Sequence, residues 1–189
     1  MSKPNSWLWG ILPLLLALTL ACQMPTYPAQ TFLGQVTSRD VERARTFGSA
    51  LPHPEEWEPE ISIHTDRITV LLNHPQTNTM VYLDRRIYPH PYTEDELTRY
   101  YSPANFREVL LSHYQGVQAE AHCQDPQGKL RLYEFSAYSG DIAYFIRYWV
   151  HPKTKDRIED VVLVFPPDQA SMGDAVAQAL FPGLSHCPP

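Results

Sequence analysis

Two cysteines in this sequence each follow a histidine, and together these residues offer a set of metal ligands. The pairs are His122-Cys123 and His186-Cys187, so the ligand types of a Cys2His2 zinc site are present. Adjacent residues of a strand point to opposite faces of a sheet, which makes a shared metal unfavourable. Zinc sites also usually use pairs of ligands with other residues between them, as in CxxC. We therefore expect no metal and no cofactor.

Catalysis would have to use the histidines, because the motifs of known nucleophiles, phosphate loops and covalent haem are missing. Four histidines precede a proline and are expected in solvated loops: His53, His74, His90 and His151. His113 falls on the apolar face of a predicted helix, where a partly buried structural role is expected. A hydrolase is the alternative, and it would need His113 or His122 beside a carboxylate in one pocket. An enzyme is not the favoured interpretation.

Arg85 and Arg86 are neighbours in a predicted strand, so only one of them can face a given side of the sheet. With Tyr82 and Asp84 close by, an arginine here could bind an anion. A salt-bridged strand edge explains the same residues and is the favoured interpretation.

Aromatic residues are concentrated between residues 100 and 149, and most of them are expected in the core. Tyrosine and tryptophan are also common contact residues of interfaces. The candidates for contact with a partner or a ligand are Tyr133, Tyr144, Tyr148 and Trp149.

The elements that position these residues can be read from the spacing of apolar and turn residues. Four strands on short connections predict an antiparallel meander over 117–124, 130–138, 142–150 and 157–165. Alternating apolar residues between Ile61 and Leu72, and the segment 79–88, predict further strands. Both faces of segment 142–150 are apolar, so its second face is either covered or an interaction surface.

Helices are predicted before and after the meander. Thr93 begins a capping box for a short helix, and Ser102-Pro103 begins a second helix that runs to about Gln115. Thr37 begins a possible short helix near the start, and Asp168 begins the last one. We expect an α+β fold: one antiparallel sheet of five or six strands with helices packed mainly on one face.

Composition limits the class of protein. The chain has 189 residues, which fits one domain, and its net charge of -6 argues against a nucleic-acid partner.

The amino-terminal sequence is typical of a secretion signal. Residues 1–21 have one positive charge followed by a short apolar run, and they end in Leu18-Thr19-Leu20-Ala21-Cys22. This ending resembles the lipobox of bacterial lipoproteins. The resemblance implies that Cys22 becomes the lipidated first residue of an exported protein anchored to a membrane. This would be the outer or plasma membrane, or the lumen side of the thylakoid if the source is cyanobacterial.

An exported domain lies in an oxidising compartment, so a Cys123–Cys187 disulfide is predicted. The expected organisation is a signal peptide (1–21), a lipid-anchored tether with a Pro/Glu-rich segment (22–60) and an α+β domain (61–189). Trp57 could attach the Pro/Glu-rich segment to the domain.

These features predict a lipid-anchored binding or assembly factor at a membrane complex or the cell envelope, with a protein partner there. Besides the hydrolase, a small-ligand binder with an apolar pocket under the meander is an alternative. The order of helix, meander and final helix is loosely similar to PsbP-like domains.

Overall fold

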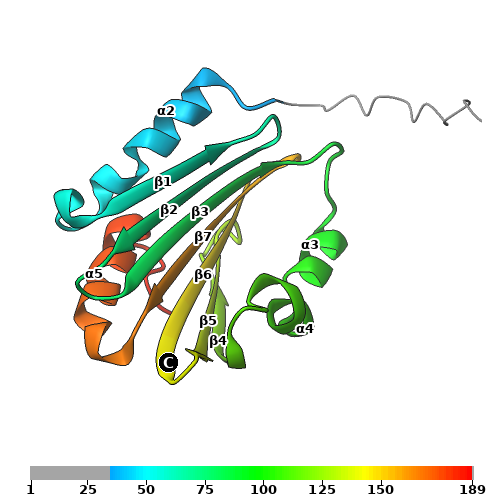
Figure 1. The fold of residues 1–189 in the computed structure, drawn as a ribbon. Helices are drawn as coiled ribbons and strands as arrows, with labels where there is room; N and C mark the ends of the chain where they lie inside the picture. Colours follow the sequence, from blue (N-terminus) through cyan, green and yellow to red (C-terminus); the bar gives the residue numbers. More distant parts are fainter. Residues whose placement is uncertain (1–34, 189) are drawn as a thin grey trace, which may run out of the picture. The chain divides into compact units, whose positions relative to one another are not determined.

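The computed structural model describes residues 35–188, and their centre is one seven-stranded antiparallel sheet (Figure 1). The α+β class is confirmed, but the expected count of five or six strands was too low. The strands are β1 (Glu58–Ile63), β2 (Arg67–His74), β3 (Thr79–Ile87), β4 (Gln115–Gln124), β5 (Arg131–Ser139), β6 (Ile142–Thr154) and β7 (Arg157–Phe165).

Two meanders make up the sheet. Strands β1, β2 and β3 form the first, β4 to β7 form the second, and β3 pairs with β7 to give the order β1-β2-β3-β7-β6-β5-β4. Strand β1 begins earlier than the expected Ile61, at Glu58, in a segment whose prolines and glutamates suggested irregular structure. An edge strand tolerates this composition because one side of its backbone needs no partner strand.

One face of the sheet carries α2 (Ser38–Thr46) and α5 (Ala170–Leu180), as Figure 1 shows. Thr37 caps α2 in a capping box with Asp40, which confirms the predicted short helix. Ala44 of α2 and Val176 of α5 are buried against the sheet. Trp57 is also buried there, and its indole N–H donates to the Pro52 carbonyl at 2.9 Å.

The packed unit therefore starts before Ile61, the expected beginning of the domain. The part of segment 22–60 that is described contributes a helix and a buried tryptophan to the core, because both carry apolar groups that the sheet covers. The described residues, 35–188, all belong to one compact unit. The signal peptide and Cys22 lie outside the described residues.

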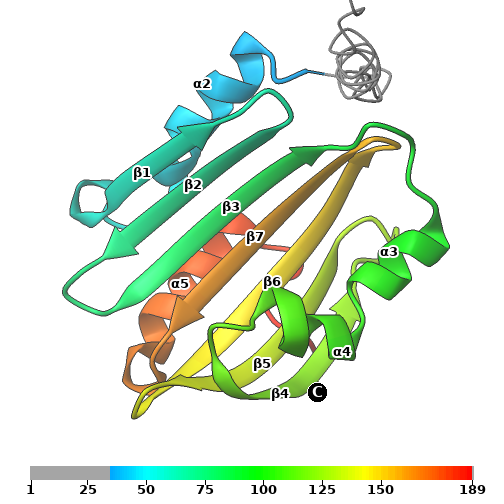
Figure 2. The same ribbon diagram turned by 45° about the vertical axis from the view of Figure 1, so that its right-hand side comes forward.

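The opposite face carries α3 (Glu94–Tyr100), α4 (Pro103–Asn105) and the π-helical turn η3 (Phe106–Leu110) (Figure 2). Helices packed mainly on one face were thus a wrong prediction. The reason is visible in β6, where Trp149 packs toward α5 while Ile146 and Tyr148 pack toward α3 and η3. Both faces of this strand are covered from Ile146 to Val150, whereas Ile142 and Phe145 near its start are exposed.

A disulfide between Cys123 of β4 and Cys187 closes the C-terminal tail onto the sheet, as predicted. A disulfide is compatible with an exported location. Within residues 35–188, the helices are all too short or too polar to cross a bilayer.

Candidate functional site

Strand β3 sends its two neighbouring arginines to opposite faces of the sheet, as their spacing predicted. Arg85 faces α2, where it pairs with Glu159 and with Asp40. Arg86 faces α3, where its guanidinium pairs with Asp160 and donates to the Tyr100 hydroxyl at 2.7 Å. Both arginines are salt-bridged, as expected, but the predicted strand edge was wrong, because β3 lies inside the sheet between β2 and β7.

Asp160 of β7 is the centre of the network around Arg86. Its carboxylate is fully buried and accepts hydrogen bonds from Tyr101 at 2.8 Å and from Tyr148 at 2.9 Å. Burial raises the pKa of Asp160 to about 6, although Arg86 and the two hydroxyl groups act in the opposite direction. Asp84 lies directly opposite on β3, and its negative charge raises this pKa further.

The negative charge of Asp84 is balanced by Arg67. Arg67 of β2 binds its carboxylate in a bidentate manner, with Nε–Oδ1 and Nη2–Oδ2 distances of 2.8 and 2.9 Å. Arg86 Nε lies 3.1 Å from Asp84 Oδ2, yet it is buried without hydrogen-bond geometry to any acceptor in residues 35–188. The network thus fixes two arginines at one end of the sheet face.

A cavity of about 420 Å³ lies beside this network, between the sheet and η3. We call it the β2–β3 pocket. The residues that line it include Arg67, Leu71, Met80, Tyr82, Arg86 and Val162. Its volume falls within the range of small-molecule sites, about 300–1,000 Å³.

The wall of this pocket opposite the sheet is an irregular helix. The Leu111 N–H bonds to the Phe106 carbonyl five residues earlier, which makes η3 a π-helical turn of the kind often found at functional sites. Phe106 is buried against Tyr148, but Val109 is 56% exposed. The helix predicted to reach Gln115 ends at Leu110, because the chain turns there to begin β4.

A second hollow, of about 640 Å³, lies on the other side of α4 beside β4 and β5. His122 stacks on Tyr133 there with ring centroids 4.3 Å apart, and Arg131 pairs with Glu94 across it. Burial and the charge of Arg131 lower the pKa of His122. This hollow is more open than the cavity beside η3.

The four predicted contact aromatics divide into two kinds. Tyr148 and Trp149 are 5% and 0% exposed, so these two are core residues and not surface contacts. Both have polar partners inside the protein. The Tyr148 hydroxyl donates to Asp160, and the Trp149 indole N–H donates to the Leu184 carbonyl at 2.7 Å. Tyr133 lines the hollow beside β4, and Tyr144 packs edge-on against Tyr114, so both stay partly exposed.

The histidines depart from expectation at three positions. His151 lies half-buried in β6 and not in a solvated loop. His113 is exposed at the end of η3 rather than partly buried, because the predicted helix stops before it. His74 is buried and not solvated: its ring bonds Glu56 Oε2 and Thr77 Oγ1, each at 2.9 Å, and packs edge-on against Trp57. It therefore attaches the segment before β1 to the sheet.

A hydrolase would need a histidine and a carboxylate joined in a pocket. In residues 35–188 neither His113 nor His122 hydrogen-bonds a carboxylate, and the His74–Glu56 pair lines neither hollow. The sequence signals for the observed site were Arg86, Asp84 and Tyr82, together with Tyr148, predicted as a contact residue, and His113, which also lines the β2–β3 pocket. Asp160 was missed because its partners are far from it in sequence.

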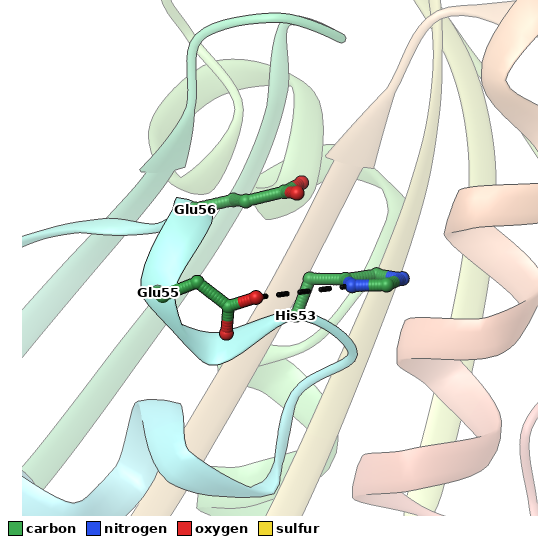
Figure 3. A group of neighbouring side chains, drawn as sticks. All are labelled: His53, Glu55 and Glu56. Carbon is green, nitrogen blue, oxygen red and sulfur yellow. Dashed lines mark ion pairs between the residues drawn. The ribbon is translucent and has the colours of Figure 1, made fainter.

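Metal binding finds little support among the described residues. Both cysteines of the Cys2His2 set are in the disulfide and are not free ligands. A different group, His53, Glu55 and Glu56, brings ligand atoms together before β1 (Figure 3). All three are exposed, and the Glu56 carboxylate is already bound by His74.

No model of a known protein family matches the chain, and the comparison with characterised proteins finds no significant match.

Proposed function

We propose that this protein is an exported, lipid-anchored binding or accessory protein that holds a small ligand in the β2–β3 pocket. The observation that carries the proposal is a ligand-sized cavity whose floor is fixed by the buried Asp160 network. A floor of this kind favours binding, because its charged groups are held in place before a ligand arrives. Cys22 supplies the anchor at an outer or plasma membrane, and the lipoprotein acts beside an envelope protein partner.

Photolabelling of the full chain in membranes tests the pocket. An uncharged alkyl diazirine should label peptides of β2, β3 and η3, as mapped by mass spectrometry. Leu71→Trp places an indole in the pocket and should abolish this labelling. Ile63→Trp is the matched control, since Ile63 is 46% exposed on edge strand β1 outside the pocket. Unlabelled pocket peptides in the wild-type protein would refute a small-ligand function.

The anchor is tested separately. Cys22→Ser should move the protein out of the membrane fraction and stop incorporation of radiolabelled fatty acid. Continued incorporation into the variant would show that the anchor is elsewhere. The hydrolase alternative predicts a different result at the pocket, because a hydrolase would turn over an ester or amide substrate there and a binding protein would not.

A further inference from the structure

Strand register gives the β2–β3 pocket a polar end and an apolar end. Arg86, Asp84, Tyr82 and Met80 are alternate residues of β3, so they share one face in that order along the strand. On β7 the same face reads Asp160, Val162 and then Val164. The charged groups therefore lie at one end, followed by the Tyr82–Val162 pair and then by the apolar Met80–Val164 pair, about 13 Å along the strand from Asp84 at 3.3 Å per residue.

Hydrogen-bond donors at the polar end are in excess. Arg67 Nη1 and the protons of the Tyr82 and Tyr100 hydroxyls make no hydrogen bond as donors to any residue in 35–188. Both hydroxyls instead accept from arginine, Tyr82 from Arg67 at 3.3 Å and Tyr100 from Arg86 at 2.7 Å. Their protons are therefore directed away from the guanidinium groups. The Arg86 Nε is a further donor without an acceptor.

Acceptors at the same end are already occupied. Both oxygens of Asp84 accept from Arg67, and both oxygens of Asp160 accept from tyrosine hydroxyls or from Arg86. A ligand that brings further donors would compete with these arginine and tyrosine groups for the same oxygens, whereas a ligand that brings acceptors would pair with the donors that are left over. One of these donors, Arg86 Nε, is buried and unpaired.

We propose that the β2–β3 pocket binds an amphipathic carboxylate, with the carboxylate at Arg67, Tyr82 and Tyr100 and the alkyl chain over Met80 and Val162. The proposal rests on the proposed function, because it names the ligand class of the same pocket. Arg67 suits the head group since its side chain is 44% exposed, so it can reach a carboxylate at the mouth. A fatty acid has this chemistry.

Competition against the uncharged photolabel tests the ligand class in the full, membrane-bound chain. Decanoate should displace the label from pocket peptides at a concentration at least tenfold lower than decylamine, because the amine brings only donors. Methyl decanoate keeps a carbonyl acceptor without the charge and should fall between the two.

Two variants locate the head group. Arg67→Met and Tyr100→Phe should each weaken competition by decanoate about tenfold to a hundredfold while leaving the uncharged label in place. Arg45→Met and Tyr138→Phe are the matched controls, because both residues are exposed and do not line the pocket.

The outcomes separate the two proposals. Equal competition by decylamine and decanoate, or full decanoate competition in both Arg67→Met and Tyr100→Phe, would overturn the carboxylate assignment and leave ligand binding intact. Missing label in the wild-type pocket would instead refute the proposed function itself. If Arg67→Met does not fold, Tyr100→Phe still decides the question, since it removes one hydroxyl from a partly exposed ring.

Discussion

Replacing Asp160 by asparagine should remove a pH dependence that this carboxyl imposes on stability. Asp160 is fully buried, and burial raises its pKa from the ordinary 3.8 to about 6 in the folded chain. In the unfolded chain the same carboxyl is solvated and keeps its ordinary pKa. The folded state therefore binds this proton more tightly than the unfolded state does.

The sign and size of the effect follow from this difference. Below the ordinary pKa both states carry the proton, and above about 6 both have lost it, so the dependence falls between these limits. In this window the folded chain holds more protons than the unfolded chain, so its stability decreases as the pH rises. A pKa raised from 3.8 to about 6 corresponds to about 3 kcal/mol across the window.

Urea unfolding of the wild-type protein and Asp160→Asn, at several values from about pH 4 to about pH 7, measures this contribution. Asparagine cannot titrate, and Arg86 keeps Asp84 as a charged partner in the variant. The free energy of unfolding of the wild type, minus that of the variant, should therefore fall by about 3 kcal/mol from the acid end to the neutral end. Other carboxyls cancel in this comparison.

Asp141→Asn is the control, because it removes an exposed carboxylate from the turn between β5 and β6. Its unfolding free energy should follow that of the wild type at every pH. A constant difference between wild type and Asp160→Asn over the whole range would refute the reasoning, since Asp160 would then not titrate differently in the two states.

Three further predictions concern stability. Replacing Cys123 and Cys187 by alanine opens a loop with a sequence separation of 64 and should cost about 4 kcal/mol in urea unfolding; an unchanged midpoint would contradict this. Gly173→Ala places a Cβ 2.7 Å from an aromatic ring of β7 and should cost about 1–3 kcal/mol, whereas Gly183→Ala, with nothing within 4 Å, should cost far less in the same thermal melts. Trp57→Ala should cost about 3–5 kcal/mol, and a loss below 1 kcal/mol would show that the segment before β1 is not part of the core.

The strands of the second meander could be predicted closely because their apolar runs are bounded by turn residues. The predicted 157–165 is β7 exactly as observed, and 142–150 lies within β6. Edge strand β1 was predicted only from Ile61 onward, since its first residues, Glu58 to Glu60, are held by pairing with β2 and not by their own preference. Local sequence carries little information about such pairing.

The candidate site could be predicted only in part. Adjacent arginines on a strand had to face opposite sides of the sheet. The sequence also indicated that an arginine here, with Asp84 and Tyr82, could bind an anion. Its buried partner Asp160 lies 74 residues away in sequence, and the pairing depends on β3 lying beside β7. Tyr148 was assigned to a contact surface because composition favours tyrosine there, whereas its hydroxyl is used by Asp160 inside the protein.

The same buried carboxylate connects the core to the pocket. The layer formed by α3, α4 and η3 is short, and few of its side chains are fully buried. Tyr101 at the end of α3 donates to Asp160 on the sheet, which joins that layer to the sheet by a hydrogen bond to a charged group. The layer is also held by apolar packing, because Phe106 lies against Tyr133, Phe135 and Tyr148. With the layer attached in these two ways, the sheet face keeps an open cavity beside η3, which a continuous apolar interface would have filled.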